Sequence, residues 1–166
     1  FTADDVVFSF QRIMSPTSTL QAFVAGVKEV KKVDSHTVDF ILERPNPILT
    51  RTIVDFRIVS KAWAEKNKAI APPNYKAKEE NYATRNAMGT GPYKIVSWQP
   101  EQRITMAQNA DWWDAKNASN VKEVIYTPIK SDQTRVAALL SGEVDMMTDM
   151  PTQDVAKIKG DGKFKV

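Results

Sequence analysis

The sequence predicts a mixed α/β fold in which helices flank a mixed sheet, and three observations support this prediction. Apolar residues recur at the spacing of one helix face in residues 3–14 and 132–142. Apolar and polar residues alternate in residues 37–43, which is typical of a half-buried strand. Segments of these two kinds follow one another along the chain, and this order is typical of sheets with right-handed crossover connections.

The first half of the chain is predicted to place a hairpin between helices. Thr2 and Asp5 are typical of a helix start, and Ser15-Pro16 ends that helix because a residue before proline avoids helical geometry. Residues 69–88 hold two prolines and many charges, so we expect a long loop there. The predicted elements are a helix at 3–14, a helical turn at 20–24, strands at 27–33 and 37–43, a helix from 46 to about 54, a strand at 57–59 and a helix at 61–68.

The second half begins with a turn at Gly89–Pro92 and again mixes strands with helices. Ser131 is typical of a helix cap, and Gly142 is typical of the residue that follows a helix. The predicted elements are strands at 93–98 and 102–108, a helical turn at 111–113, a strand at 121–129, a helix at 132–142, a strand at 144–148 and a helix at 151–159.

The composition excludes several classes of protein. The 166 residues include no cysteine, which excludes disulfides, thiolate metal sites and a cysteine nucleophile. A single histidine excludes a two-histidine metal motif. No apolar run approaches the roughly 20 residues of a membrane-spanning helix. The net charge of +3 is too small and too scattered for a nucleic-acid footprint. We therefore expect no metal, no cofactor and no nucleic-acid partner.

The motifs in the sequence favour structural roles over catalytic ones. Gly89-Thr90-Gly91 lacks the third glycine of a dinucleotide fingerprint and precedes a strand, so a tight turn is the better interpretation. The carboxylates of Asp4-Asp5 are explained by helix capping, not by acid–base chemistry. Trp112-Trp113 either stack on a ligand or pin a turn onto the sheet, and the sequence leaves both interpretations open.

Three segments together resemble a known family. Residues 1–12 follow the pattern FTAxDVxxSxxR. Residues 89–113 run from Gly-Thr-Gly-Pro-Tyr-Lys to Asn-Ala-Asp-Trp-Trp, and residues 121–145 run from Val-Lys-Glu-Val to Ser-Gly-Glu-Val-Asp. In this order the segments resemble the family 5 extracellular solute-binding proteins, which are the dipeptide, oligopeptide and nickel receptors of ABC importers. Members are much longer, and this chain begins on a helix cap and ends in an alternating segment, so we expect it to be a piece of a longer protein.

The resemblance implies part of a periplasmic-binding-protein type II lobe and a non-catalytic receptor. Residues 1–88 are then expected to be part of the extra (second) domain of the N-terminal lobe, and residues 89–166 part of the first sheet domain near the hinge. Two lobes of such a receptor close on a peptide or similar small solute and deliver it to a membrane permease with its ATPase.

The expected location is the periplasm, or the cell surface as a lipoprotein. A nickel complex, an opine or a sugar remains open as the solute. We also expect the piece by itself to self-associate through apolar surface that the longer protein buries. The alternative function is a non-transport structural or interaction module with the same lobe fold.

A candidate ligand site follows from the rule that ligands of open α/β sheets lie beyond the carboxyl ends of strands. The strand predicted at 144–148 leads into Thr148, Asp149 and Met150, which are therefore candidate ligand-binding residues, although packing alone is an alternative interpretation of this segment. Arg135 and Asp145 lie in the motifs that carry the resemblance, and we expect them to brace the sheet.

Overall fold

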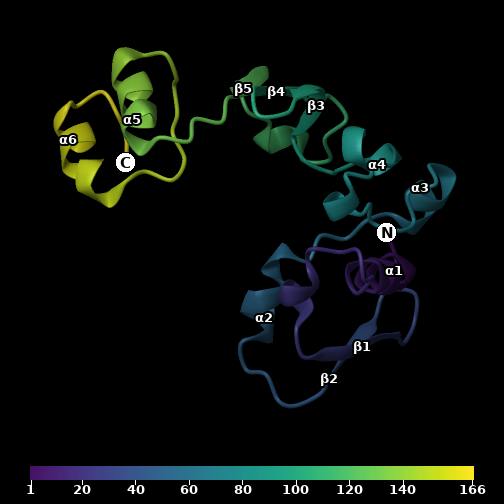
Figure 1. Ribbon diagram of the computed structural model, residues 1–166. Coiled ribbons are helices and arrows are strands. Elements are labelled where there is room, and N and C mark those ends of the chain that lie inside the picture. Colours follow the sequence, from purple (N-terminus) through teal and green to yellow (C-terminus); the bar gives the residue numbers. More distant parts are fainter. The chain divides into compact units, whose positions relative to one another are not determined.

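The computed structural model describes residues 1–166 and divides into two compact units, Phe1–Gly89 and Thr90–Val166 (Figure 1). Both units combine helices with strands, which confirms the predicted mixed α/β fold class. No helix has the length and apolar character needed to cross a bilayer.

The first unit is built on a helix that packs against a two-stranded hairpin. Helix α1 (Ala3–Ile13) lies next to β1 (Val27–Lys32), which pairs antiparallel with β2 (Val38–Leu42) (Figure 1). The helix and the hairpin match their predicted positions because the apolar residues of both point toward one cluster. The buried residues of this cluster are Val6, Phe10, Ile13, Val24, Val27 and Val30.

Two side chains of α1 accept hydrogen bonds from backbone N–H groups at the start of α3 (Lys61–Lys66) and just before it. Asp5 accepts the backbone N–H of Lys61 at 2.8 Å. The Ser9 hydroxyl oxygen accepts the backbone N–H of Val59 at 2.8 Å. The strand predicted at 57–59 is therefore wrong, because the backbone there is bound by a side chain and not by a neighbouring strand.

Two further helices in the first unit are short. Helix α2 (Leu49–Thr52) begins three residues after Asn46, whose side-chain oxygen accepts the N–H of Ile48 at 3.1 Å, and so the predicted helix from 46 to 54 is shortened. Helix α4 (Tyr82–Arg85) lies inside the predicted loop 69–88, which is therefore not wholly irregular. Single turns of 3₁₀ helix occupy residues 21–24, 53–55 and 75–77.

The second unit contains a three-stranded antiparallel sheet. Its strands β3 (Tyr93–Gln99), β4 (Arg103–Gln108) and β5 (Glu123–Tyr126) neighbour one another in that order. The expected mixed sheet with crossover connections is not formed, because every pair in both sheets is antiparallel. Only residues 100–102 join β3 to β4, and a connection this short permits no crossover.

The connection from β4 to β5 also differs from the prediction. The helical turn predicted at 111–113 is wrong, since Asn109 accepts the N–H of Asp111 in a local turn and the 3₁₀ turn follows at 115–117. The strand predicted at 121–129 is confirmed only over β5, four residues in its middle.

The rest of the second unit is a pair of helices around a small core. Helix α5 (Asp132–Ser141) begins at Ser131, whose hydroxyl accepts the N–H of Thr134, and ends at Gly142, as predicted. A 3₁₀ turn at 152–154 leads into α6 (Val155–Gly160), close to the predicted helix at 151–159. The buried side chains between the two helices are Val136, Leu139 and Ile158.

The strand predicted at 144–148 is absent. The backbone N–H groups of Glu143 and Val144 both donate to the carbonyl of Ala138, at 2.9 and 3.2 Å, so the chain folds back along the end of α5. Val144, Met147 and Met150 then pack against the helical core at a spacing of three residues, whereas a strand would alternate every two.

Candidate functional site

The three predicted ligand residues lie in the turn that joins α5 to the 3₁₀ turn before α6. Thr148 and Asp149 are exposed, whereas Met150 is half-buried and packs against the core between α5 and α6. The buried ring of Pro151 follows directly. The turn is thus anchored on one side by apolar packing, and it presents two polar side chains to solvent. Its position after a strand, on which the prediction rested, is wrong.

Asp149 has an unusual backbone and an unpaired side chain. Its φ of 54° lies in the left-handed region, which costs a residue with a Cβ about 1 kcal/mol. The carboxylate makes no hydrogen bond or ion pair in the structure, so no contact of the side chain compensates for that cost. Asp149 therefore presents an unpaired carboxylate on a turn whose conformation is fixed by neighbouring residues.

The guanidinium of Arg135 is the main polar contact of this turn. It donates to the backbone carbonyl of Asp149 at 3.2 Å and to that of Ile129 at 2.8 Å. It also donates to the Asp132 carboxylate at 2.5 Å. The expectation that Arg135 and Asp145 brace the sheet is wrong, because Arg135 binds the loops at the two ends of α5 and Asp145 is exposed without a partner.

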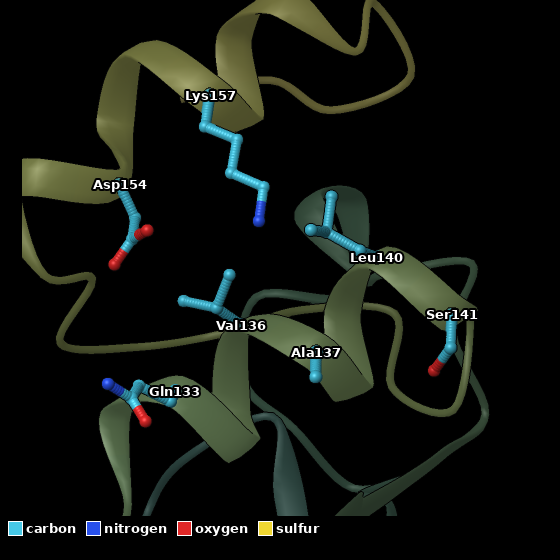
Figure 2. Close-up of a pocket in the computed structure, with 7 residues that line it drawn as sticks. All are labelled: Gln133, Val136, Ala137, Leu140, Ser141, Asp154 and Lys157. Carbon is cyan, nitrogen blue, oxygen red and sulfur yellow. The ribbon is translucent and has the colours of Figure 1, made fainter.

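An open groove, which the sequence does not predict, lies between α5 and α6 (Figure 2). Its volume is about 470 Å³. Figure 2 shows Val136 and Leu140 on one side of the groove and Asp154 and Lys157 on the other, with the Lys157 amine pointing into the space between them. The residues that line it are Gln133, Val136, Ala137, Leu140, Ser141, Asp154 and Lys157. None of the three predicted ligand residues is among them, and a groove between two helices leaves no signal in the sequence of either helix.

The Trp112-Trp113 pair stands apart from both features. The two rings meet edge to face with centroids 5.8 Å apart. Trp113 is 78% exposed, so it does not pin the turn onto the sheet, whereas Trp112 is half-buried.

Two carboxylates outside this turn, those of Asp5 and Asp111, make structural contacts. Two backbone N–H groups, of Lys61 and Thr2, hold the pKa of Asp5 below its usual range. An ion pair with Lys94 at 2.8 Å lowers the pKa of Asp111. Both groups are therefore ionised at neutral pH, as capping and pairing require. No cluster of three or more side chains in the structure is arranged to hold a metal ion.

The whole chain, residues 1–166, matches the family model described as bacterial extracellular solute-binding proteins, family 5, middle region. The chain belongs to this family. Among curated relatives, the periplasmic oligopeptide-binding protein OppA of Salmonella typhimurium is 30% identical to this family 5 chain, and the match covers 95% of the chain. The chain spans about 31% of the length of that relative.

Solved structures of periplasmic binding proteins share the architecture of the chain. The periplasmic binding protein DppA of Helicobacter pylori, in complex with the peptide STSA, superposes with a TM-score of 0.68 at 26% identity over 96% of this chain and 32% of its own. The binding protein AgaA of A. tumefaciens R10, in complex with agropinic acid, gives a TM-score of 0.69 at 28% identity over 96% of this chain and 30% of its own. The expected partial periplasmic-binding-protein lobe is thereby confirmed.

Proposed function

We propose that this chain is the middle region of a non-catalytic receptor that captures a solute for an ABC importer. The family match over residues 1–166 carries the proposal. The similarity to an oligopeptide-binding protein over 95% of the chain supports it. Because the chain spans about a third of these relatives, the lobe that closes over the solute belongs to the remainder of the receptor.

Peptides are the solute class that the relatives favour. One similar protein is named for oligopeptides, and another holds the peptide STSA. A peptide carries an ammonium group, and the free carboxylate of Asp149 complements it through a charge-assisted hydrogen bond. In this site Thr148 supplies a hydroxyl, and Met150 anchors the turn in the core. A receptor of similar fold holds agropinic acid, so an opine is the competing solute class.

The same relatives support a proposal for the surroundings of the receptor. The receptor works in the periplasm, or on the cell surface as a lipoprotein, and its partners are the importer's permease and ATPase. Residues 1–88 form part of the extra (second) domain of the N-terminal lobe, and residues 89–166 form part of the first sheet domain near the hinge. The chain taken alone associates with itself.

Thermal-shift measurements on the full-length receptor test the proposed function. The protein is screened against di- to pentapeptides, nickel–histidine complexes, opines and oligosaccharides. A solute that binds only the folded state at 100 times its Kd adds about 2.7 kcal/mol of stability and raises Tm by several degrees. We expect peptides to raise Tm. If only opines raised Tm, the solute class would be opines and not peptides. Chemical conversion of any added solute would contradict the proposal of a non-catalytic receptor.

The substitution Asp149→Asn tests the proposed site. Asparagine tolerates the left-handed backbone, so the change removes the charge without straining the turn. Loss of a charge-assisted hydrogen bond costs about 1.5–3 kcal/mol, so we expect peptide affinity to fall about 10- to 100-fold by calorimetry. The matched control is Asp145→Asn, an exposed carboxylate in the same segment, which leaves the affinity unchanged. Equal effects of the two variants would rule out a local role for Asp149.

A further inference from the structure

Arg135 connects two loops that are far apart in the sequence. Nη1 donates to the carbonyls of Ile129 at 2.8 Å and Lys130 at 3.3 Å, the last residues before the Ser131 cap of α5. Nη2 donates to the carbonyl of Asp149, in the turn that follows α5. One guanidinium therefore joins the chain that enters α5 to the chain that leaves it. The side chain is 22% exposed, and of its hydrogen bonds the one to the Ile129 carbonyl is partly buried, whereas the one to the Asp149 carbonyl is exposed to solvent.

Helix stability does not explain this placement. Arg135 lies near the N-terminal end of α5, where the helix dipole disfavours a positive charge. The Asp132 carboxylate offsets that penalty by accepting a bond from Nη2. Nη1 donates to the loop before α5 and Nη2 donates to the turn after it. Only a guanidinium can make both contacts in this way, since lysine offers a single nitrogen.

The turn that receives Nη2 needs an anchor. The backbone of Asp149 is held in the left-handed region without help from its own side chain. Met150 fixes the turn on its C-terminal side by packing in the core. The hydrogen bond from Arg135 to the Asp149 carbonyl fixes the peptide group between Asp149 and Met150. With both anchors in place, the backbone that carries the exposed carboxylate is held in one conformation.

We propose that Arg135 is the positioning residue of the solute site, because its guanidinium clamps the Thr148–Met150 turn to residues 129–130. The effect on solute affinity rests on the proposed function, whereas the clamp is a property of the free protein. Arg135 touches no solute in this scheme. It acts through the backbone of Asp149 and lowers the entropy that binding would otherwise cost.

The experiment uses the full-length receptor and the variants Arg135→Gln and Arg135→Lys, with Arg103→Gln as the control. Arg103 is an exposed arginine on β4, so the control makes the same chemical change without breaking the clamp. ¹⁵N relaxation of the free protein gives the order parameter of the Asp149 amide. Calorimetry with the tetrapeptide Ser-Thr-Ser-Ala gives the affinity.

We expect the order parameter of Asp149 to fall from about 0.85 to below about 0.6 in both Arg135 variants and to stay unchanged in the control. Peptide affinity falls at least 10-fold with Arg135→Gln, and lysine does not restore it. In the double variant with Asp149→Asn the losses are smaller than their sum, because both changes act on one carboxylate.

The outcomes separate the clamp from the proposed function. A rigid Asp149 amide in Arg135→Gln overturns the clamp, whatever the solute. Peptide affinity that survives Arg135→Gln but falls with Asp149→Asn also overturns the positioning role. If the wild-type receptor binds no peptide, or Asp149→Asn has no effect, then the proposed solute or site fails, and the order parameter alone decides the clamp.

Discussion

A single carboxylate, that of Asp5, accepts backbone N–H groups at the N-terminal ends of two helices in the first unit. One of its oxygens accepts the backbone N–H of Thr2 at 2.8 Å and completes the capping box of α1. The other accepts the N–H of Lys61, the first residue of α3. The sequence predicts the first bond, because the Thr2 and Asp5 spacing is local. It does not predict the second, because the bond joins residues 56 positions apart.

Asp5→Asn is expected to destabilise the protein by about 1 kcal/mol, because the amide keeps only one acceptor for two helix-end N–H groups. Urea unfolding of the full-length protein at pH 7 measures this loss. The matched control is Asp39→Asn, an exposed carboxylate on β2, for which we expect a change within about 0.5 kcal/mol.

The same carboxylate gives stability a pH dependence. The N–H groups of Lys61 and Thr2 lower the pKa of Asp5 in the folded state below its unfolded value. Its contribution is therefore complete above the unfolded pKa near 4 and is lost as the pH falls through the folded pKa. Between pH 7 and pH 3 we expect the wild type to lose more stability than Asp5→Asn. Parallel curves for the two proteins would show that Asp5 is not the titrating group.

Two glycines at helix ends have opposite requirements. Gly142 follows α5 with φ of 81°, in the left-handed region, whereas Gly160 is the last residue of α6 and has no positive φ. A Cβ added at either position would meet no atom within 4 Å. Any effect of alanine at these positions is therefore conformational and does not come from a clash.

We expect Gly142→Ala to destabilise the protein by about 1 kcal/mol, because the left-handed region penalises a Cβ. We expect Gly160→Ala to stabilise it by about 0.5 kcal/mol, because alanine loses less backbone entropy in a helix. Thermal unfolding of the two variants measures the difference. Shifts of the same sign would show that the end of α5 rearranges to a right-handed cap.

Elements with a local cause were predictable, and elements whose cause lies elsewhere in the chain were not. The positions of α1, the hairpin and α5 follow from caps and periodicity within each segment. Residues 57–59 are extended because Ser9 binds their backbone, and residues 144–148 wrap around the end of α5. For the candidate site, the sequence pointed to Asp149 but not to its left-handed backbone or its bond to Arg135, which depends on tertiary structure.

The accessible surface of the chain is larger than its mass requires. The structure exposes 12342 Å². A compact monomer of 18.7 kDa would expose about 8300 Å², and two separate bodies of half that mass about 10000 Å² together. The excess therefore does not depend on how the two units are placed. Large apolar side chains contribute to it, and on the sheet of the second unit Val96 is 65% exposed and Ile125 is 54% exposed.

Exposed apolar surface of this kind drives association in water. We expect the isolated chain to form concentration-dependent oligomers in gel filtration with light scattering and to bind a hydrophobic dye. Because the relatives are about three times longer than this chain, we expect the full-length receptor to cover this surface and to remain monomeric without dye binding. Threonine retains the strand preference of a β-branched residue, so the double variant Val96→Thr, Ile125→Thr should reduce both signals without breaking the sheet. The prediction is contradicted if the isolated chain is a monomer and binds no dye. Its exposed apolar area would then be tolerated in solution without cover from the remainder of the receptor.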